Sequence, residues 1–265
     1  MARPLEGMSV LVTRPAPQGE KLVAAIREAG GTALAFPLLE IRELDRDPSV
    51  DAVFDRLDGF DIAIFISANA VRAALGRWRE RGSAWPATLM CLAIGSATAQ
   101  ALAREGIAAT SAAVAMISEE LLALDALAQV AGRRIVIFKG AGGRDLLATS
   151  LRARGAHVSE CGLYRRVAPA TPPAELARQL AHNGVDTVLI SSGEGLSNLL
   201  GLLGGDLAGT MAGRITLVVP GERVAQLARA SGFMRLEVAS NATDEAMLAV
   251  LRGLAARKRA ESEHT

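Results

Sequence analysis

The sequence predicts an α/β fold with parallel sheets, in two domains related by internal duplication. Apolar runs of strand length alternate with segments of helical spacing, which is the pattern of a parallel sheet covered by helices. The chain also repeats itself once, at an offset of 125 or 126 residues. Its length of 265 residues accommodates two domains of ordinary size.

The repeat keeps both the order and the character of its segments. The matched ranges are 10–14 with 135–139, 60–71 with 185–196, 93–107 with 218–233, and 118–120 with 243–245. Ser67 is thereby matched with Ser192. Solenoid repeats have much shorter periods, about 20 to 50 residues. The long period therefore indicates duplication of a whole domain.

Strands and helices are predicted in alternation along the chain. The apolar runs that predict strands are 9–13, 62–66, 89–94, 134–138, 186–191 and 215–219. Their nearly unbroken apolar character is typical of strands covered on both faces. Helical spacing occurs at 18–29, 68–80, 97–105, 118–129, 144–154, 194–203, 222–231 and 243–257. Pro-containing segments near 36–41 and 163–170 interrupt the alternation, and we expect the chain to pass between domains there.

Composition excludes several classes of partner. A net charge of +1 gives no general electrostatic reason to bind nucleic acid or an anionic membrane. Aromatic residues at 3% leave no platform for base stacking, and no apolar stretch has the length of a membrane span. Cys91 and Cys161 stand in apolar runs without metal or redox spacing, which predicts buried thiols. We expect a cytoplasmic protein.

Small, polar or basic turns follow the predicted strands. The carboxyl ends of parallel strands meet at one edge of a sheet, where helix N-termini bind anions. The candidate binding residues in these turns are Thr13, Arg14, Ser67, Ala68, Asn69, Ser96, Thr98, Lys139, Gly140, Gly142, Arg144, Ser191, Ser192, Gly193 and Gly221. The same residue types also cap helices in proteins without a ligand. Their recurrence in both repeats favours a site for a polyanion.

Several sharper motifs are absent or incomplete. The run 140–145 has two glycines of a dinucleotide fingerprint, but Asp145 occupies the place of the third. The phosphate-binding lysine motif is absent, and the scattered histidines form no metal spacing. Ser67 and Ser192 lack a nucleophile-elbow context. The sequence thus predicts no cofactor, no metal and no covalent nucleophile.

Tyr164 is the only tyrosine of the chain and stands in the second passage between the predicted domains. Its phenol can serve as a proton donor or as a positioning group. The alternative is a structural tyrosine that packs its ring and hydrogen-bonds a carbonyl. Tyr164 is our candidate catalytic residue.

In combination these residues resemble the uroporphyrinogen-III synthase family over nearly the whole chain. The resemblance is carried by 10–41, 60–71, 93–102, 142–166, 185–200 and 242–251. It implies two flavodoxin-like domains joined by a two-stranded linker, with a substrate cleft between them. Domain one would comprise 1–37 and 168–265, and domain two 38–167. The repeat alone fits contiguous halves equally well.

The resemblance also implies a reaction. A hydro-lyase of this family cyclises hydroxymethylbilane, with loss of water and inversion of the terminal pyrrole ring, in haem biosynthesis and without a cofactor. The substrate is an octacarboxylate, and the free N–H groups at helix starts are suited to bind its carboxylates. Tyr164 would assist the departing hydroxyl, while Ser67 and Thr98 match cleft-lining positions and Ser192 lies on the opposite domain. We expect a monomer, with hydroxymethylbilane synthase as a candidate transient partner.

Other readings of the sequence stay open. A non-catalytic two-domain sensor of an anionic ligand, or a synthase relative without activity, would have the same fold and repeats. A nucleotide-dependent transferase on a similar frame is disfavoured by the incomplete phosphate-binding patterns. Type III porphyrin formation separates the synthase from all three alternatives.

Overall fold

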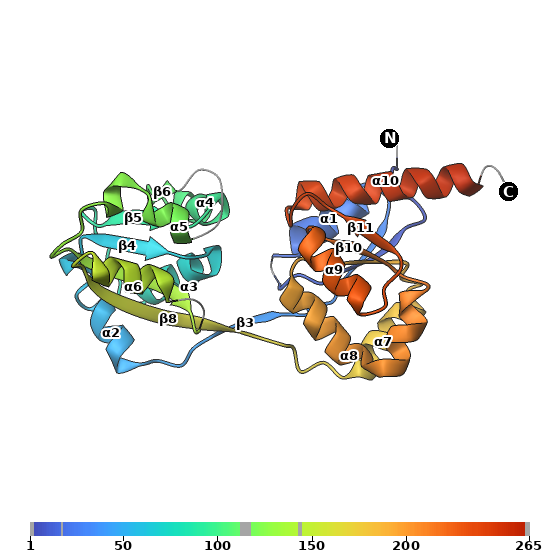
Figure 1. Ribbon diagram of the computed structural model, residues 1–265, viewed down its shortest axis with the longest axis horizontal. Coiled ribbons are helices and arrows are strands. Elements are labelled where there is room, and N and C mark those ends of the chain that lie inside the picture. Colours follow the sequence, from blue (N-terminus) through green and yellow to red (C-terminus); the bar gives the residue numbers. More distant parts are fainter. Residues whose placement is uncertain (1–2, 17, 112–117, 143–144, 263–265) are drawn as a thin grey trace. The chain divides into compact units, whose positions relative to one another are not determined.

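The computed structural model describes residues 3–16, 18–111, 118–142 and 145–262 (Figure 1). The chain forms two compact units. Unit 1 comprises Met1–Glu40 and Val167–Thr265, and unit 2 comprises Ile41–Arg166. The division expected from the sequence was 1–37 with 168–265, against 38–167. Each unit has its own parallel sheet and its own core, so the predicted α/β fold class is confirmed.

Unit 1 contains a sheet of five parallel strands in the order β11-β10-β9-β1-β2. The strands are β1 (Ser9–Val12), β2 (Thr32–Ala35), β9 (Thr187–Leu189), β10 (Thr216–Val219) and β11 (Leu236–Val238). Numbered within the unit and read from β2, the order is 2-1-3-4-5, as in flavodoxin. Each crossover carries at least one helix, which the geometry of parallel neighbours requires.

Helices cover both faces of the unit 1 sheet. They are α1 (Glu20–Glu28), α7 (Pro173–His182), α8 (Gly193–Ala212), α9 (Glu222–Ala230) and α10 (Asp244–Ser262). Successive strand residues point to opposite faces. Val10 and Val12 therefore join the core under α1 and α10, whereas Leu11 joins the core under α7, α8 and α9. This two-sided burial explains the nearly unbroken apolar runs of the sequence.

Unit 2 contains a sheet of six strands in the order β3-β8-β7-β4-β5-β6. They are β3 (Glu40–Glu43), β4 (Ile62–Phe65), β5 (Met90–Ala93), β6 (Thr110–Ser111), β7 (Arg134–Gly140) and β8 (His157–Val167). Both crossings between the units fall inside neighbouring strands of this sheet, one in β3 and one in β8. The two units are therefore joined by a two-stranded linker.

The two faces of the unit 2 sheet have cores of different composition. The helical elements are α2 (Pro48–Phe54), η1 (Leu57–Gly59), α3 (Ala68–Arg79), α4 (Ser96–Arg104), α5 (Ser118–Leu122), η2 (Asp125–Leu127) and α6 (Leu146–Ala153). An aromatic cluster lies under α2 and α3, where Phe138 packs against Phe54, Phe65 and Trp85. The opposite face, under α5 and α6, is aliphatic.

The two sheets are built from exchanged halves of the repeat. In unit 1, Val12 of β1 lies opposite Leu189 of β9. In unit 2, Ile137 of β7 lies opposite Ile64 of β4, and these residues are related to the first pair by the offset of 125. Each unit therefore combines strands of both repeats in the same register. Two contiguous halves would have required each repeat to close its own sheet.

Several segments differ from the sequence-based expectation. The predicted helix 118–129 is broken into α5 and η2, because Leu124 has an extended backbone (φ −66°, ψ 138°). Helix α7 and strands β2, β6 and β11 were not predicted. The passage expected near 163–170 is the end of strand β8, where the chain crosses from unit 2 to unit 1. An unpredicted helix, α2, begins after Asp47, whose carboxylate accepts the Ser49 N–H at 2.8 Å. Asp47 followed by Pro48 is a recognisable helix start.

Both cysteines are free and buried, as their apolar surroundings predict. Burial raises the pKa of Cys91 to about 11 and that of Cys161 to about 12. Thiols with such pKa values hold little reactive thiolate at neutral pH. In the part of the chain that the structure describes, no helix combines the length and apolarity needed to cross a membrane.

Candidate functional site

The predicted site residues of each unit lie at the carboxyl edge of its sheet. In unit 1 they follow β1, β9 and β10. In unit 2 they follow β4 and β5, lie at or after the end of β7, or lie in β8 opposite that end, as Tyr164 does. Helices α3, α4, α8 and α9 begin at these edges. Their first N–H groups have no intrahelical acceptor and attract anions. Arg144, also predicted, lies outside the described residues.

Tyr164 and Ser67 meet at the edge of unit 2. Their hydroxyl oxygens are 2.8 Å apart, and either can donate the hydrogen bond. Ser67 is the N-cap of α3, where its Oγ accepts the Ala70 N–H at 3.1 Å. The Tyr164 side chain comes from β8 and is 3% exposed. The structure thus brings together two residues that are 97 positions apart.

One hydroxyl proton of this pair is left over. The two hydroxyls carry two protons, and the bond between them uses one, whichever group donates. The Ala70 N–H occupies a lone pair of Ser67 and not its proton. Among the described residues neither hydroxyl donates to any further acceptor. The remaining O–H therefore has no acceptor among the described residues, which is a condition for a general acid or a positioning donor.

Gly140, at the end of β7, sets the position of the Tyr164 ring. A Cβ at Gly140 would lie 2.9 Å from Cε2 and from Cζ of Tyr164. The register between β7 and β8 shifts at Lys139 and Gly140, and such bulges change where nearby side chains point. The phenol therefore occupies the space that any other residue at 140 would fill.

We expect Gly140→Ala to lower the free energy of unfolding of unit 2 by about 1 to 3 kcal/mol, because overpacking forces the buried ring to move. Both tryptophans, Trp78 and Trp85, lie in unit 2, so denaturation followed by tryptophan fluorescence reports this unit. Gly162→Ala is the matched control, since its Cβ would approach no described atom closer than 3.7 Å. Equal stabilities of the two variants would contradict the packing argument.

Lys139 is held by two carboxylates at the end of β7. Its Nζ lies 2.8 Å from Glu160 and 3.2 Å from Asp145, and Glu160 also pairs with Arg152 at 2.9 Å. Burial alone would lower the pKa of Lys139, but the two carboxylates raise it above its ordinary value. Burial would raise the pKa of Glu160, but Lys139 and Arg152 hold it below its ordinary value. The charge of Lys139 is thus neutralised within the unit.

We expect Lys139→Met to destabilise unit 2 by about 1 to 2 kcal/mol at pH 7, a value between those of exposed and buried pairs. The depressed pKa of Glu160 means that its contribution is complete above its ordinary pKa of 4.5 and is lost as the pH falls through the lower folded value. The difference from the wild type should therefore be constant above about pH 5 and shrink as the pH falls below 4.5. Fluorescence-monitored unfolding between pH 6 and pH 3 measures it, and a difference that stays constant below pH 4.5 would refute the pairing.

The start of α4 offers backbone groups to solvent. Its N-cap, Gly95, has φ 78° and no side-chain hydrogen bond to the helix. Ser96 is exposed, whereas Thr98 is buried at 3% exposure. At the neighbouring start of α3, Ala68 and Asn69 are half-buried, and Asn69 accepts from Arg72. Ser96 is thus the accessible hydroxyl of this turn.

Two predicted binding residues of unit 1 make internal contacts. The Thr13 hydroxyl, 2% exposed, donates to the Leu189 carbonyl at 2.6 Å and ties β1 to β9. Arg14 pairs with Asp244 at the start of α10 and donates to the Ala242 carbonyl. Its side chain is 14% exposed. These contacts join the edge of the sheet to α10 and occupy both side chains.

The repeat produces matching helix caps in the two units. Ser192 caps α8 by accepting the Gly195 N–H at 3.0 Å, as Ser67 caps α3. Ser191, Ser192 and Gly193 are half-buried. Gly142 (φ 75°) and Gly221 (φ 149°) have backbone conformations that favour glycine. Both glycines therefore have a structural role in their turns, which does not depend on whether they contact a ligand.

Sequence reasoning missed the partners that neutralise the cations. Glu160, Asp145 and Asp244 bind Lys139 or Arg14, yet the sequence offered no signal because the contacts link separate elements. No group of three or more His, Cys, Asp or Glu side chains in the described ranges is arranged to hold a metal ion.

Comparison with known proteins places this architecture in a family. Residues 20–249 match the family described as "Uroporphyrinogen-III synthase HemD". The chain is 39% identical to uroporphyrinogen-III synthase of Salmonella typhimurium, with 92% of this chain and 100% of that protein covered. Identity to the Escherichia coli uroporphyrinogen-III synthase is 36%, with the same coverage.

Solved structures agree in fold. A mutant uroporphyrinogen III synthase from Thermus thermophilus superposes with a TM-score of 0.61 at 20% identity, covering 95% of this chain and 100% of that chain. The enzyme from Helicobacter pylori superposes with a TM-score of 0.55 at 17% identity, covering 93% and 99%. With the family match over most of the chain, these findings show that the chain belongs to the uroporphyrinogen-III synthase family.

Proposed function

We propose that this chain is a uroporphyrinogen-III synthase, which converts hydroxymethylbilane into uroporphyrinogen III and water in haem biosynthesis. The observation that carries the proposal is the 39% identity that extends over 100% of a curated synthase. The polar carboxyl edges of both sheets support it, because they supply N–H and hydroxyl donors suited to a polycarboxylate.

The Tyr164 and Ser67 pair is the proposed source of the proton for the departing hydroxyl. The donated proton lets the substrate hydroxyl leave as water, which gives an electrophilic azafulvenium cation and lowers the barrier to that loss. The proton that the pyrroles release on ring closure restores the donor. The leftover proton of the pair meets this need whether it resides on Tyr164 or on Ser67. Ring closure at the substituted carbon of the last pyrrole then depends on how the chain holds that ring.

Carboxylate recognition in the proposed enzyme uses neutral donors as well as cations. Lys139 and Arg14 are already paired with carboxylates of their own units. Backbone N–H groups at the starts of α3, α4, α8 and α9, with hydroxyls such as Ser96, supply uncharged donors at these edges, and the exposed Arg223 at the start of α9 supplies a charged one. The uncharged donors bind carboxylates without the desolvation cost of a free cation. We further propose a cytoplasmic monomer that acts without a cofactor.

The test is isomer-resolved chromatography of the porphyrins formed when fresh hydroxymethylbilane is incubated with the protein and then oxidised. Type III in excess of the control without protein is the expected result. Only spontaneous type I from folded protein would refute the synthase and favour an inactive relative or a sensor of an anionic ligand.

A further inference from the structure

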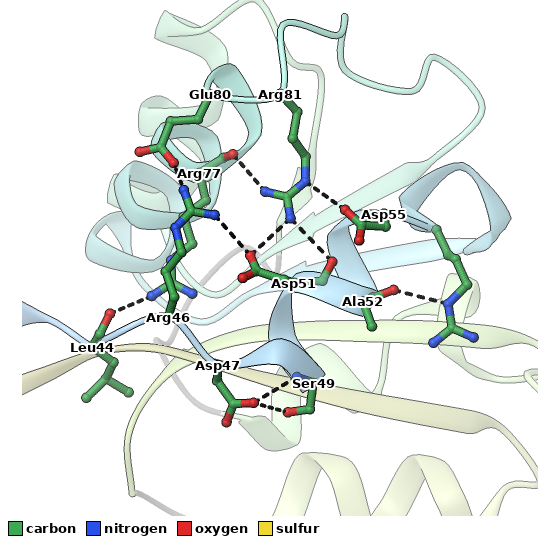
Figure 2. A network of polar contacts seen from close by, with 11 residues as sticks. Leu44, Arg46, Asp47, Ser49, Asp51, Ala52, Asp55, Arg77, Glu80 and Arg81 are labelled. Atoms are coloured by element: carbon green, nitrogen blue, oxygen red, sulfur yellow. Dashed lines mark hydrogen bonds and ion pairs between the residues drawn. The ribbon is translucent and has the colours of Figure 1, made fainter.

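Arg77 is a buried cation whose described partner is a neutral carbonyl. It lies on α3 and is 6% exposed. Its Nη2 donates to the carbonyl of Leu44 at 2.7 Å, while its Nη1 is buried without a hydrogen-bond partner among the described residues (Figure 2). The charge of Arg77 helps to lower the pKa of Asp47 and of Asp51, after hydrogen bonds from Ser49 and from Arg81 respectively, but neither carboxylate forms an ion pair with it. A buried donor without a hydrogen-bond partner is costly.

The neighbouring arginines behave differently. Arg81 binds Asp51 at 3.0 Å and Asp55 at 3.2 Å, and Arg46 pairs with Asp51 and Glu80 (Figure 2). These contacts join α2 to the end of α3. Arg77 forms no ion pair with any described residue. Its hydrogen bond instead holds the segment that leads from β3 to α2.

Leu44 connects this segment to the strand that carries Tyr164. Its N–H donates to the Leu163 carbonyl at 3.0 Å. Its Cδ1 lies 3.7 Å from the position of a Cβ on Gly162. Leu44 is therefore held on one side by β8, directly before Tyr164, and on the other side by Arg77.

Helix α3 thus contacts the Tyr164 region at both of its ends. Ser67, at its start, forms a hydrogen bond with the phenol. Arg77, in its last turn, donates to the Leu44 carbonyl, and the Leu44 N–H donates to the carbonyl of Leu163, the residue before Tyr164. We propose that Arg77 is a positioning residue, which holds β3 against β8 and so keeps the Tyr164 hydroxyl at Ser67. The catalytic consequence of this inference rests on the proposed synthase function.

We expect Arg77→Met to lower kcat for type III formation by about three- to tenfold, because small displacements of a reacting group are costly. KM should change less, since Arg77 is buried away from the donors proposed to bind carboxylates. Methionine is similar in length and apolar, and such replacements of buried charges are often tolerated. Steady-state kinetics measures both constants.

Because the chain has a single tyrosine, NMR of that residue gives a second measurement, which does not depend on enzymatic activity. Protein labelled with ¹³C in the tyrosine ring has one tyrosine spin system, which reports Tyr164 directly. Its resonances should shift in Arg77→Met. Arg81→Met is the matched control, because Arg81 donates to the backbone carbonyl of Arg77 but does not bond Leu44, so the link from Arg77 to Leu44 is kept and the tyrosine signal should stay unchanged.

Arg77→Lys tests the hydrogen bond itself. Lysine keeps one donor for the Leu44 carbonyl, although it lacks the planar fork of arginine, so kcat should lie between those of the wild type and Arg77→Met. If Arg77→Met fails to fold, Arg77→Lys and Arg81→Met are compared instead. Folded Arg77→Met or Arg77→Lys with unchanged kcat and an unchanged tyrosine signal would overturn the proposal. If the protein proves not to be a synthase, the tyrosine signal still tests whether Arg77 positions Tyr164.

Discussion

Tyr164→Phe is expected to lower kcat for type III formation by about tenfold to a hundredfold, at or below the low end of the roughly hundredfold to ten-thousandfold that proton donors contribute. The substituted ring fills the same space beside Gly140, so the fold should persist. One neutral hydrogen bond to Ser67 is lost, at a cost of about 0.5 to 1.5 kcal/mol in stability. Steady-state kinetics with isomer-resolved product analysis measures the effect.

A double variant tests whether Tyr164 acts together with Ser67. The contribution of the pair is shared, so the double variant Tyr164→Phe/Ser67→Ala should lose less than the product of the two single losses. Ser67→Ala also removes the cap of α3, which costs about 1 kcal/mol and must be checked by denaturation. Unchanged kcat in folded Tyr164→Phe would remove the phenol from the mechanism. Independent losses would show that the two hydroxyls act separately.

Phe138→Ala is expected to destabilise unit 2 by about 3 to 5 kcal/mol, the usual cost of deleting a buried aromatic ring. Phe138 is fully buried, with ring centroids of Phe65 and Phe54 at 5.0 and 5.4 Å. The cavity that it leaves is lined by the apolar side chains of this cluster, and apolar cavities stay empty of water. Denaturation followed by fluorescence of the two tryptophans isolates the transition of unit 2.

The adjacent residue on β7 supplies the control for Phe138. Ile137 points into the aliphatic core on the other face of the same sheet. Ile137→Val should cost only about 0.5 to 1.5 kcal/mol, because it removes one methylene. A loss in Phe138→Ala no larger than that of Ile137→Val would mean that the aromatic cluster relaxes around the cavity and contributes little.

The sequence was sufficient for much of the architecture. Largely apolar runs such as 9–13 and 62–66 identified buried parallel strands, because two-sided burial leaves few polar positions in a strand. The offset of 125 residues predicted that Ser67 and Ser192 are equivalent, and both cap helices in the same way. These features depend on local pattern and on comparison within one chain, both of which a sequence contains.

Tertiary structure decided what no local pattern encodes. The repeat by itself left the exchange of strands open, since contiguous halves satisfy the same hydrophobic pattern, and only the family resemblance implied it. Equally, Tyr164 meets Ser67 over 97 positions, and Lys139 is neutralised by Glu160, 21 positions away. Whether a polar side chain serves a ligand or the fold depends on which atoms folding brings within hydrogen-bond distance. The sequence determined the elements and their chemistry, and packing determined the partners, because hydrogen bonds and ion pairs act over a few ångströms in space regardless of separation along the chain.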